Sequence, residues 1–122
     1  MKSALIVDDS DAARSLIRSL VEDIGDVNVS EASTGFEALK SLPHQPFDII
    51  LVDINMPDIN GVELIHFIKS TDRYKNIPVI IVSTESSEED INRGMSLGAF
   101  AYITKPFKSE ELQGVVKKAL NL

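Results

Sequence analysis

The chain has 122 residues and a net charge of −7, from 19 acidic and 12 basic side chains. This length predicts a single domain spanning residues 1–122. The acidic balance, without any block of Lys or Arg, argues against direct binding to nucleic acid or to an anionic membrane. Cysteine, a signal-peptide core and an apolar run of the roughly 20 residues that span a membrane are all absent, so we expect a soluble cytoplasmic protein.

Five short apolar runs alternate with segments of helical periodicity. The runs span residues 4–7, 27–32, 49–52, 79–82 and 99–104. Helical stripes are plain at 13–24 and 112–120, where apolar residues recur every three or four positions. An N-cap residue with Glu three positions later predicts helix starts at Thr34, Asn60 and Ser86. Because the runs are too far apart for hairpins, the pattern predicts an α/β fold, a parallel (βα)5 sheet.

Composition also predicts which strands lie in the middle of the sheet. A parallel strand covered on both faces is continuously apolar, whereas an edge strand is more mixed. The first, third and fourth runs are continuous, while 27–32 and 99–104 are mixed. This predicts the strand order 2-1-3-4-5, with right-handed crossovers placing helices on both faces of a doubly wound sheet.

Polar side chains stand where four of these strands end. They are Asp8 and Asp9 after the first strand, Asp53 after the third, Ser83 at the end of the fourth and Lys105 after the fifth. Since neighbouring strands lie about 4.8 Å apart, the predicted order brings these groups to one edge of the sheet. Three close carboxylates repel unless a cation lies among them. A hard, oxygen-binding ion such as Mg²⁺ suits the set.

Asp53 is the candidate nucleophile of this group. It ends a run of four large apolar residues, where an unpaired charge would be costly. A carboxylate can attack phosphorus to give an aspartyl phosphate, and Lys105 and Ser83 would provide a positive charge and a donor for the phosphoryl oxygens. The two histidines, His44 and His66, fall on or beside predicted helices and are expected to be solvated.

Each of these residues also has an ordinary explanation when it is taken alone. Asp9 suits a cap for a helix starting near Ser10, and Asp53 suits a turn acid before Asn, Pro and Gly. Ser83 would then be a cap and Lys105 a surface lysine. Their coincidence at one edge of the sheet favours a functional site.

Four motifs in order make the chain resemble a known family. They are VDDS at 7–10, DINMPDING at 53–61, VST at 82–84 and YITKPF at 102–107. Over residues 3–120 the chain resembles a response-regulator receiver domain of two-component signalling, and in particular the single-domain chemotaxis regulators. The resemblance implies a flavodoxin-like fold.

The resemblance implies specific roles for the acids. Asp53 would be the phosphoacceptor. Asp9, Asp53 and the backbone carbonyl of Asn55 would bind Mg²⁺ directly, with Mn²⁺ as a substitute metal, and Asp8 would act through water. Asn55 and Glu85 would tune how fast water removes the phosphoryl group.

The resemblance also assigns the other side of the site. Ser83 and Lys105 would hold the phosphoryl group, and the bulk of Thr84 would narrow access to it. Tyr102, otherwise a half-buried edge-strand aromatic, would be the switch aromatic. The Lys105–Pro106 peptide bond is expected to be cis, against a background of about 5% of X–Pro bonds.

The implied function is that of a regulatory phosphoacceptor rather than an enzyme with a separate substrate. The phosphoryl donor would be a histidine kinase or a histidine phosphotransfer protein, with autodephosphorylation as a slow side reaction. An unknown output protein would bind the face made by the fourth helix, fifth strand and fifth helix. The thin apolar stripe of segment 86–97 predicts that this fourth helix is weakly anchored.

Three alternatives remain. A degenerate receiver would act as a constitutive interaction module, although the acids, the serine and the lysine are all present. A haloacid-dehalogenase-type phosphatase needs a second Asp at position 55, which is Asn. A flavodoxin-like nucleotide binder would need a Gly-rich loop after the first strand, and this loop is missing.

Overall fold

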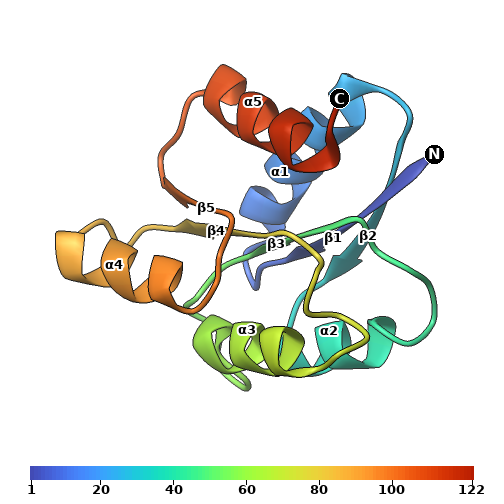
Figure 1. Ribbon diagram of the computed structural model, residues 1–122. Helices are drawn as coiled ribbons and strands as arrows, with labels where there is room; N and C mark the ends of the chain where they lie inside the picture. The colour runs from blue at the N-terminus through green and yellow to red at the C-terminus, as the bar shows by residue number, and fades with distance from the viewer.

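A computed structural model describes all 122 residues as five parallel strands alternating with five helices (Figure 1). The strands are β1 (Lys2–Val7), β2 (Val27–Ala32), β3 (Ile49–Val52), β4 (Val79–Ser83) and β5 (Ala101–Thr104). The helices are α1 (Asp11–Ile24), α2 (Gly35–Ser41), α3 (Gly61–Ser70), α4 (Glu88–Ser96) and α5 (Ser109–Leu120). The sheet order is β2-β1-β3-β4-β5, which confirms the order predicted from composition.

Burial explains why composition revealed the strand order. Every residue of β3 and β4 is buried, whereas Asn28 and Glu31 of the edge strand β2 are exposed. β5 is shorter than the predicted 99–104, because Ala99 and Phe100 belong to the bend that leaves α4. Gly98 makes this bend with a φ of 102°, a conformation that favours glycine.

Alternate residues along each central strand face two separate cores. Ile49 and Leu51 of β3 pack with α1 and α5, whereas Ile50 and Val52 pack with α2 and α3. This is the two-residue period of a strand covered on both faces. Figure 1 shows α1 and α5 above the sheet and α2 and α3 below it. None of the helices is both long enough and apolar enough to cross a bilayer.

The helix starts agree with the predicted caps except at α4. Thr34 and Asn60 accept hydrogen bonds from the backbone N–H groups of Glu37 and Glu63, as expected. The prediction of Ser86 was wrong by one residue, because Ser87 is the cap and accepts from the N–H of Asp90. Both serines have an acid three positions later, so the local pattern fits either one.

Contacts outside α4 explain where the helix begins. The N–H of Glu85 donates to Ser83 Oγ at 3.1 Å, and its carbonyl accepts from the Tyr102 hydroxyl at 2.7 Å. These two bonds keep the chain out of helical conformation after β4, and Ser87 is still extended, with φ −67° and ψ 153°. Tertiary contacts therefore choose between two equivalent local caps.

Candidate functional site

The acids Asp8 and Asp53 lie side by side at the carboxyl edge of the sheet. Their strands pair in register, with Val7 beside Val52, and the N–H of Asp53 donates to the Val7 carbonyl at 2.9 Å. Both acids are buried, with 1% of Asp8 and 8% of Asp53 exposed. Two neighbouring central strands therefore deliver two carboxylates to one enclosed position.

Lys105 reaches this pair from the loop after β5. Its ammonium Nζ donates to Asp8 Oδ2 at 2.8 Å and lies 3.3 Å from Asp53 Oδ2. The pairing of β4 with β5 places Ser83 beside Thr104, and the N–H of Lys105 donates to the Ser83 carbonyl at 2.8 Å. One lysine thus bridges two buried acids that precede it by 97 and 52 residues. The Lys105–Pro106 peptide bond is cis.

Burial and charge act in opposite directions on the groups of this pair. Burial raises the pKa of Asp53, and the nearby charge of Asp8 raises it further, whereas the Asn55 N–H and Lys105 oppose this rise. Burial alone would lower the pKa of Lys105, but the hydrogen bond with Asp8 and the charges of Asp53 and Asp8 outweigh it, so that pKa is raised. The site therefore disfavours the charged form of Asp53 and favours the charged form of Lys105.

A third acid completes a cluster that fits a metal ion. Asp8, Asp9 and Asp53 each offer a carboxylate oxygen, and these oxygens lie within 4.8 Å of one another. Asp9 is exposed while the other two are buried, so the cluster opens to solvent on one side. Because all the donors are hard oxygens, the set suits Mg²⁺ or Mn²⁺ better than a metal that prefers sulfur or nitrogen.

The loop after β1 is organised by Ser10 rather than by Asp9. Ser10 is the N-cap of α1, with its Oγ accepting from the Ala13 N–H at 3.2 Å, and its own N–H donates to Asp8 Oδ1 at 2.9 Å. The alternative that Asp9 caps this helix was therefore wrong. Asp9 keeps a free carboxylate because the neighbouring serine performs the capping role.

The loop after β3 turns away directly beyond Asp53. The N–H of Asn55 donates to Asp53 Oδ1 at 3.2 Å, while the Asn55 side chain is exposed. Gly61 passes so close that an added Cβ would lie 2.5 Å from the Asp53 carbonyl oxygen. A residue without a side chain is therefore required where α3 begins, and the turn leaves the Asp53 carboxylate accessible from one side.

The β4 side of the site carries the hydroxyl and the aromatic residue. Ser83 is completely buried, whereas Thr84 is exposed. Tyr102 is half-buried on β5, and its hydroxyl donates to the Glu85 carbonyl at 2.7 Å. Burial raises the pKa of Tyr102, so the phenol stays protonated and can donate this bond. His44 and His66 are both exposed, as expected.

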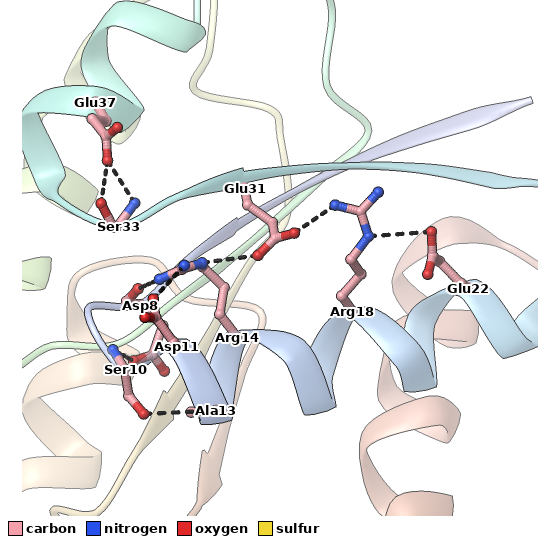
Figure 2. A network of polar contacts seen from close by, with 10 residues as sticks. All are labelled: Asp8, Ser10, Asp11, Ala13, Arg14, Arg18, Glu22, Glu31, Ser33 and Glu37. Atoms are coloured by element: carbon pink, nitrogen blue, oxygen red, sulfur yellow. Dashed lines mark hydrogen bonds and ion pairs between the residues drawn. The ribbon is translucent and has the colours of Figure 1, made fainter.

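Two residues near the site were missed from the sequence. Asp58 accepts from the N–H groups of Gly35 and Phe36 at 3.2 and 3.0 Å, so the loop after β3 is tied to the start of α2. Arg14, in the first turns of α1, donates to the Asp8 carbonyl at 2.8 Å (Figure 2). A basic residue near a helix N-terminus is unfavourable for the helix dipole, and this was the available signal for Arg14.

Comparison with known proteins identifies the family. The family model described as "Response regulator receiver domain" matches residues 4–117. The chemotaxis protein CheY of Pseudomonas aeruginosa is 34% identical over 114 residues, which cover 93% of this chain and 92% of that protein.

Solved structures agree with the sequence comparison. The chemotaxis protein CheY4 of Vibrio cholerae superposes with a TM-score of 0.90 at 33% identity, covering 98% of this chain and 99% of that one. A CheY-like receiver domain protein from Methanospirillum hungatei gives a TM-score of 0.89 at 30% identity, covering 99% and 94%. With the sheet order, the acid cluster and these matches taken together, the chain belongs to the response regulator receiver domain family.

Proposed function

We propose that residues 1–122 form a single receiver domain that acts as a phosphorelay switch, with Asp53 as the phosphoacceptor. The observation that carries the proposal is the Asp53 carboxylate, which is buried beside another acid and has the Lys105 ammonium 3.3 Å away. Such a carboxylate is chemically suited to take a negatively charged phosphoryl group, because the Lys105 ammonium can offset part of the charge that the group brings.

The donor is a phosphohistidine on a histidine kinase or a histidine phosphotransfer protein. An Asp53 oxygen attacks the phosphorus, the new O–P bond forms, and the N–P bond breaks with its electron pair returning to the histidine nitrogen. Lys105 offsets charge on the phosphoryl oxygens during the transfer, and the buried Ser83 hydroxyl holds one of them afterwards. Positioning and electrostatics supply the catalysis, so the domain needs no separate base.

Asp8, Asp9, Asp53 and the carbonyl of Asn55 are the groups that would hold a divalent ion. Asp9 and Asp53 together with the Asn55 carbonyl would bind directly, and Asp8 would act through water. Mg²⁺, or Mn²⁺ in its place, would supply positive charge against the phosphoryl oxygens when bound. The three carboxylates and the single ammonium leave a negative excess at this position, which supports the choice of a divalent cation.

Phosphorylation would change the contacts of Ser83, Thr84 and Tyr102. A phosphoryl oxygen on Asp53 would accept a hydrogen bond from the Ser83 hydroxyl and draw it away from the Glu85 N–H, which now donates to the Ser83 Oγ. Moving the β4–α4 loop would loosen the bond between Glu85 and the Tyr102 hydroxyl and bias the position of α4. The output partner would then recognise the face formed by α4, β5 and α5.

Asn55 and Glu85 would set how long the phosphoryl group survives. The Asn55 side chain is exposed beside Asp53, and Glu85 is part of the loop that Ser83 and Tyr102 hold. Both lie where they can admit or exclude the water that hydrolyses an acyl phosphate. Slow autodephosphorylation is therefore assigned to this pair.

Incubation with Mg²⁺ and acetyl phosphate tests the proposal. Intact-mass spectrometry should show the addition of one phosphoryl group to the wild-type protein, and EDTA should prevent it. Asp53→Asn should remain unmodified. Asp48→Asn is the matched control, because Asp48 directly precedes β3, at the end of the strand opposite to Asp53, and its side chain accepts from the Ser3 N–H; it should be labelled like the wild type.

The rival functions predict different results. An unmodified wild-type protein, under conditions that label another receiver, would favour a constitutive interaction module. Labelling that persists in Asp53→Asn would move the acceptor to another residue. Rapid turnover of a phosphate monoester would favour the phosphatase alternative, which lacks a second acid because position 55 is Asn.

A further inference from the structure

Arg14 connects the acid cluster to two other elements of the fold. Its guanidinium donates in three directions: Nη1 to the Asp8 carbonyl at 2.8 Å, Nη2 to Asp11 Oδ1 at 2.7 Å and Nε to Glu31 Oε1 at 2.8 Å (Figure 2). Only 15% of the Arg14 side chain is exposed. Arg14 therefore ties the end of β1, the first turn of α1 and the edge strand β2 to one point.

The bond to Asp8 differs from an ordinary surface ion pair. It holds the main chain of Asp8, while Ser10 N–H and Lys105 Nζ hold the two carboxylate oxygens at 2.9 and 2.8 Å. Asp8 is thus held at both ends. The same Asp8 carbonyl belongs to the peptide unit that leads into Asp9, so its orientation also directs the exposed acid.

Arg18 provides an internal comparison one helical turn away. It shares Glu31 with Arg14, through a contact of 2.5 Å from Nη1 to Oε2, and pairs with Glu22 at 3.3 Å. Its side chain is 38% exposed, and its hydrogen bonds are made to Glu31 and Glu22 rather than to the loop after β1. The two arginines therefore differ in their contact with Asp8 while they share the β2 anchor.

We propose that Arg14 is a positioning residue for the acid cluster, which orients Asp8 and Asp9 through the Asp8 carbonyl and is supported by Glu31 on β2. A guanidinium suits this task because its planar fork donates in several fixed directions at once, whereas an ammonium is a single point of charge. This inference rests on the proposed metal-binding role of Asp8, Asp9 and Asp53.

The sign of the effect on metal affinity separates positioning from simple electrostatics. Arg14 carries a positive charge near the cluster, so its removal would strengthen Mg²⁺ binding if charge alone mattered. If Arg14 positions the acids, its removal weakens binding, because residues that orient metal ligands typically contribute 10- to 100-fold in affinity. The two explanations predict opposite changes.

The experiment is an NMR titration of the unphosphorylated protein with MgCl₂, comparing Arg14→Gln with Arg18→Gln. We expect the Kd for Mg²⁺ to rise about 10-fold in Arg14→Gln and to change less than about twofold in Arg18→Gln, which removes only exposed ion pairs. Hydrogen exchange of the Ser10 amide, which donates to Asp8 Oδ1, should accelerate only in Arg14→Gln. Thermal unfolding establishes that both variants are folded under the titration conditions.

An equal or lower Kd in Arg14→Gln, or the same rise in both variants, would overturn the proposal. If Arg14→Gln does not fold, Arg14→Lys takes its place: it keeps the charge but loses the fork, so it too should bind Mg²⁺ more weakly than Arg18→Gln. Labelling by acetyl phosphate is a separate measurement. A wild-type protein that binds Mg²⁺ but is not phosphorylated would contradict the phosphorelay function and leave the Arg14 comparison intact.

Discussion

The loops after β1 and β4 flank the same acid cluster, but the helices they lead into are held very differently. α1 buries Ile17 and Val21 in the core and is joined to β2 by the ion pairs of Arg14 and Arg18. α4 buries only Gly94, and its Met95 is 41% exposed. The side that carries Asp8 and Asp9 is therefore fixed, while the opposite side can shift at a small cost in free energy.

α4 is nevertheless held at one close contact. Gly94 packs against the Ile81 side chain and the Tyr102 ring, and the Tyr102 hydroxyl holds the loop through Glu85. A helix with one tight contact and few buried side chains can have two positions separated by a modest free-energy difference. This arrangement suits an element whose position depends on a chemical change nearby.

Truncating one isoleucine in α1 and one in α4 should produce the largest difference in the free energy of unfolding between the two helices. Ile17 is 2% exposed in the core beneath α1, whereas Ile91 of α4 is only partly buried. We expect Ile17→Ala to lower the free energy of unfolding by about 3 kcal/mol and Ile91→Ala by less than about 1 kcal/mol. Urea denaturation measures both, and equal losses would contradict the weak anchoring of α4.

Replacing a glycine by alanine should have opposite effects on stability in α4 and in α5. Both changes are expected to be smaller than the loss from Ile17→Ala. A Cβ on Gly94 would lie 2.7 Å from Ile81 Cδ1 and 2.9 Å from Tyr102 Cδ2, whereas a Cβ on Gly114 would meet nothing within 4 Å. We expect Gly94→Ala to destabilise by about 2 kcal/mol and Gly114→Ala to stabilise by about 0.5 to 1 kcal/mol. Thermal unfolding of the two variants checks the signs.

If Gly94→Ala is tolerated without loss of stability, the contact between α4 and β5 is looser than the structure indicates. The Tyr102 ring would then have moved to make room. Near-ultraviolet circular dichroism detects such a movement, since Tyr102 is one of only two tyrosines and the chain has no tryptophan.

Removing the charge of Asp53 should change the free energy of unfolding less than Gly94→Ala does, and the sign of the change follows from the pKa of Asp53. Because the pKa of Asp53 is raised in the folded protein, the fold binds this proton more tightly than the unfolded chain does. Protonation of Asp53 therefore stabilises the folded protein at low pH, and this stabilisation is lost as the pH rises through the pKa that Asp53 has in the folded protein. In EDTA near pH 7, Asp53→Asn should therefore be more stable than the wild type by about 1 kcal/mol.

This difference should disappear as the pH falls below the ordinary aspartate range, which is about 3.9. Excess Mg²⁺ at neutral pH should reverse it, since a ligand that binds only the folded wild type stabilises it by about 2.7 kcal/mol at 100 times the Kd. Denaturation curves across pH, with and without Mg²⁺, test both statements. A difference that does not depend on pH would show that burial of the Asp53 charge is not its cause.

Local patterns in the sequence were sufficient to predict the sheet and the gathering of the acids. The apolar runs before Asp8 and Asp53 require buried central strands, and parallel strands place their ends at the same edge. The caps at Thr34 and Asn60 could also be predicted, because a cap and the residue whose N–H it accepts from are only three positions apart.

Contacts between distant residues could not be predicted in this way. The choice of Ser87 over Ser86 depends on the hydrogen bonds that Glu85 makes with Ser83 and with Tyr102. The hydrogen bonds from the first two N–H groups of α2 to Asp58 join residues more than 20 positions apart, and the ion pair of Arg14 with Glu31 joins residues 17 apart. No periodicity or local spacing encodes such pairs.

The sequence by itself determined which side chains reach the carboxyl edge of the sheet, because hydrophobic burial and strand geometry act on every strand in the same way. Only the tertiary structure decided how those side chains are held. Lys105 bonds to Asp8 and Asp53, and Arg14 bonds to the Asp8 carbonyl, because the folded chain brings β1, β3, β5 and α1 to one point. Directional hydrogen bonds depend on that three-dimensional arrangement, whereas burial depends on composition along the chain.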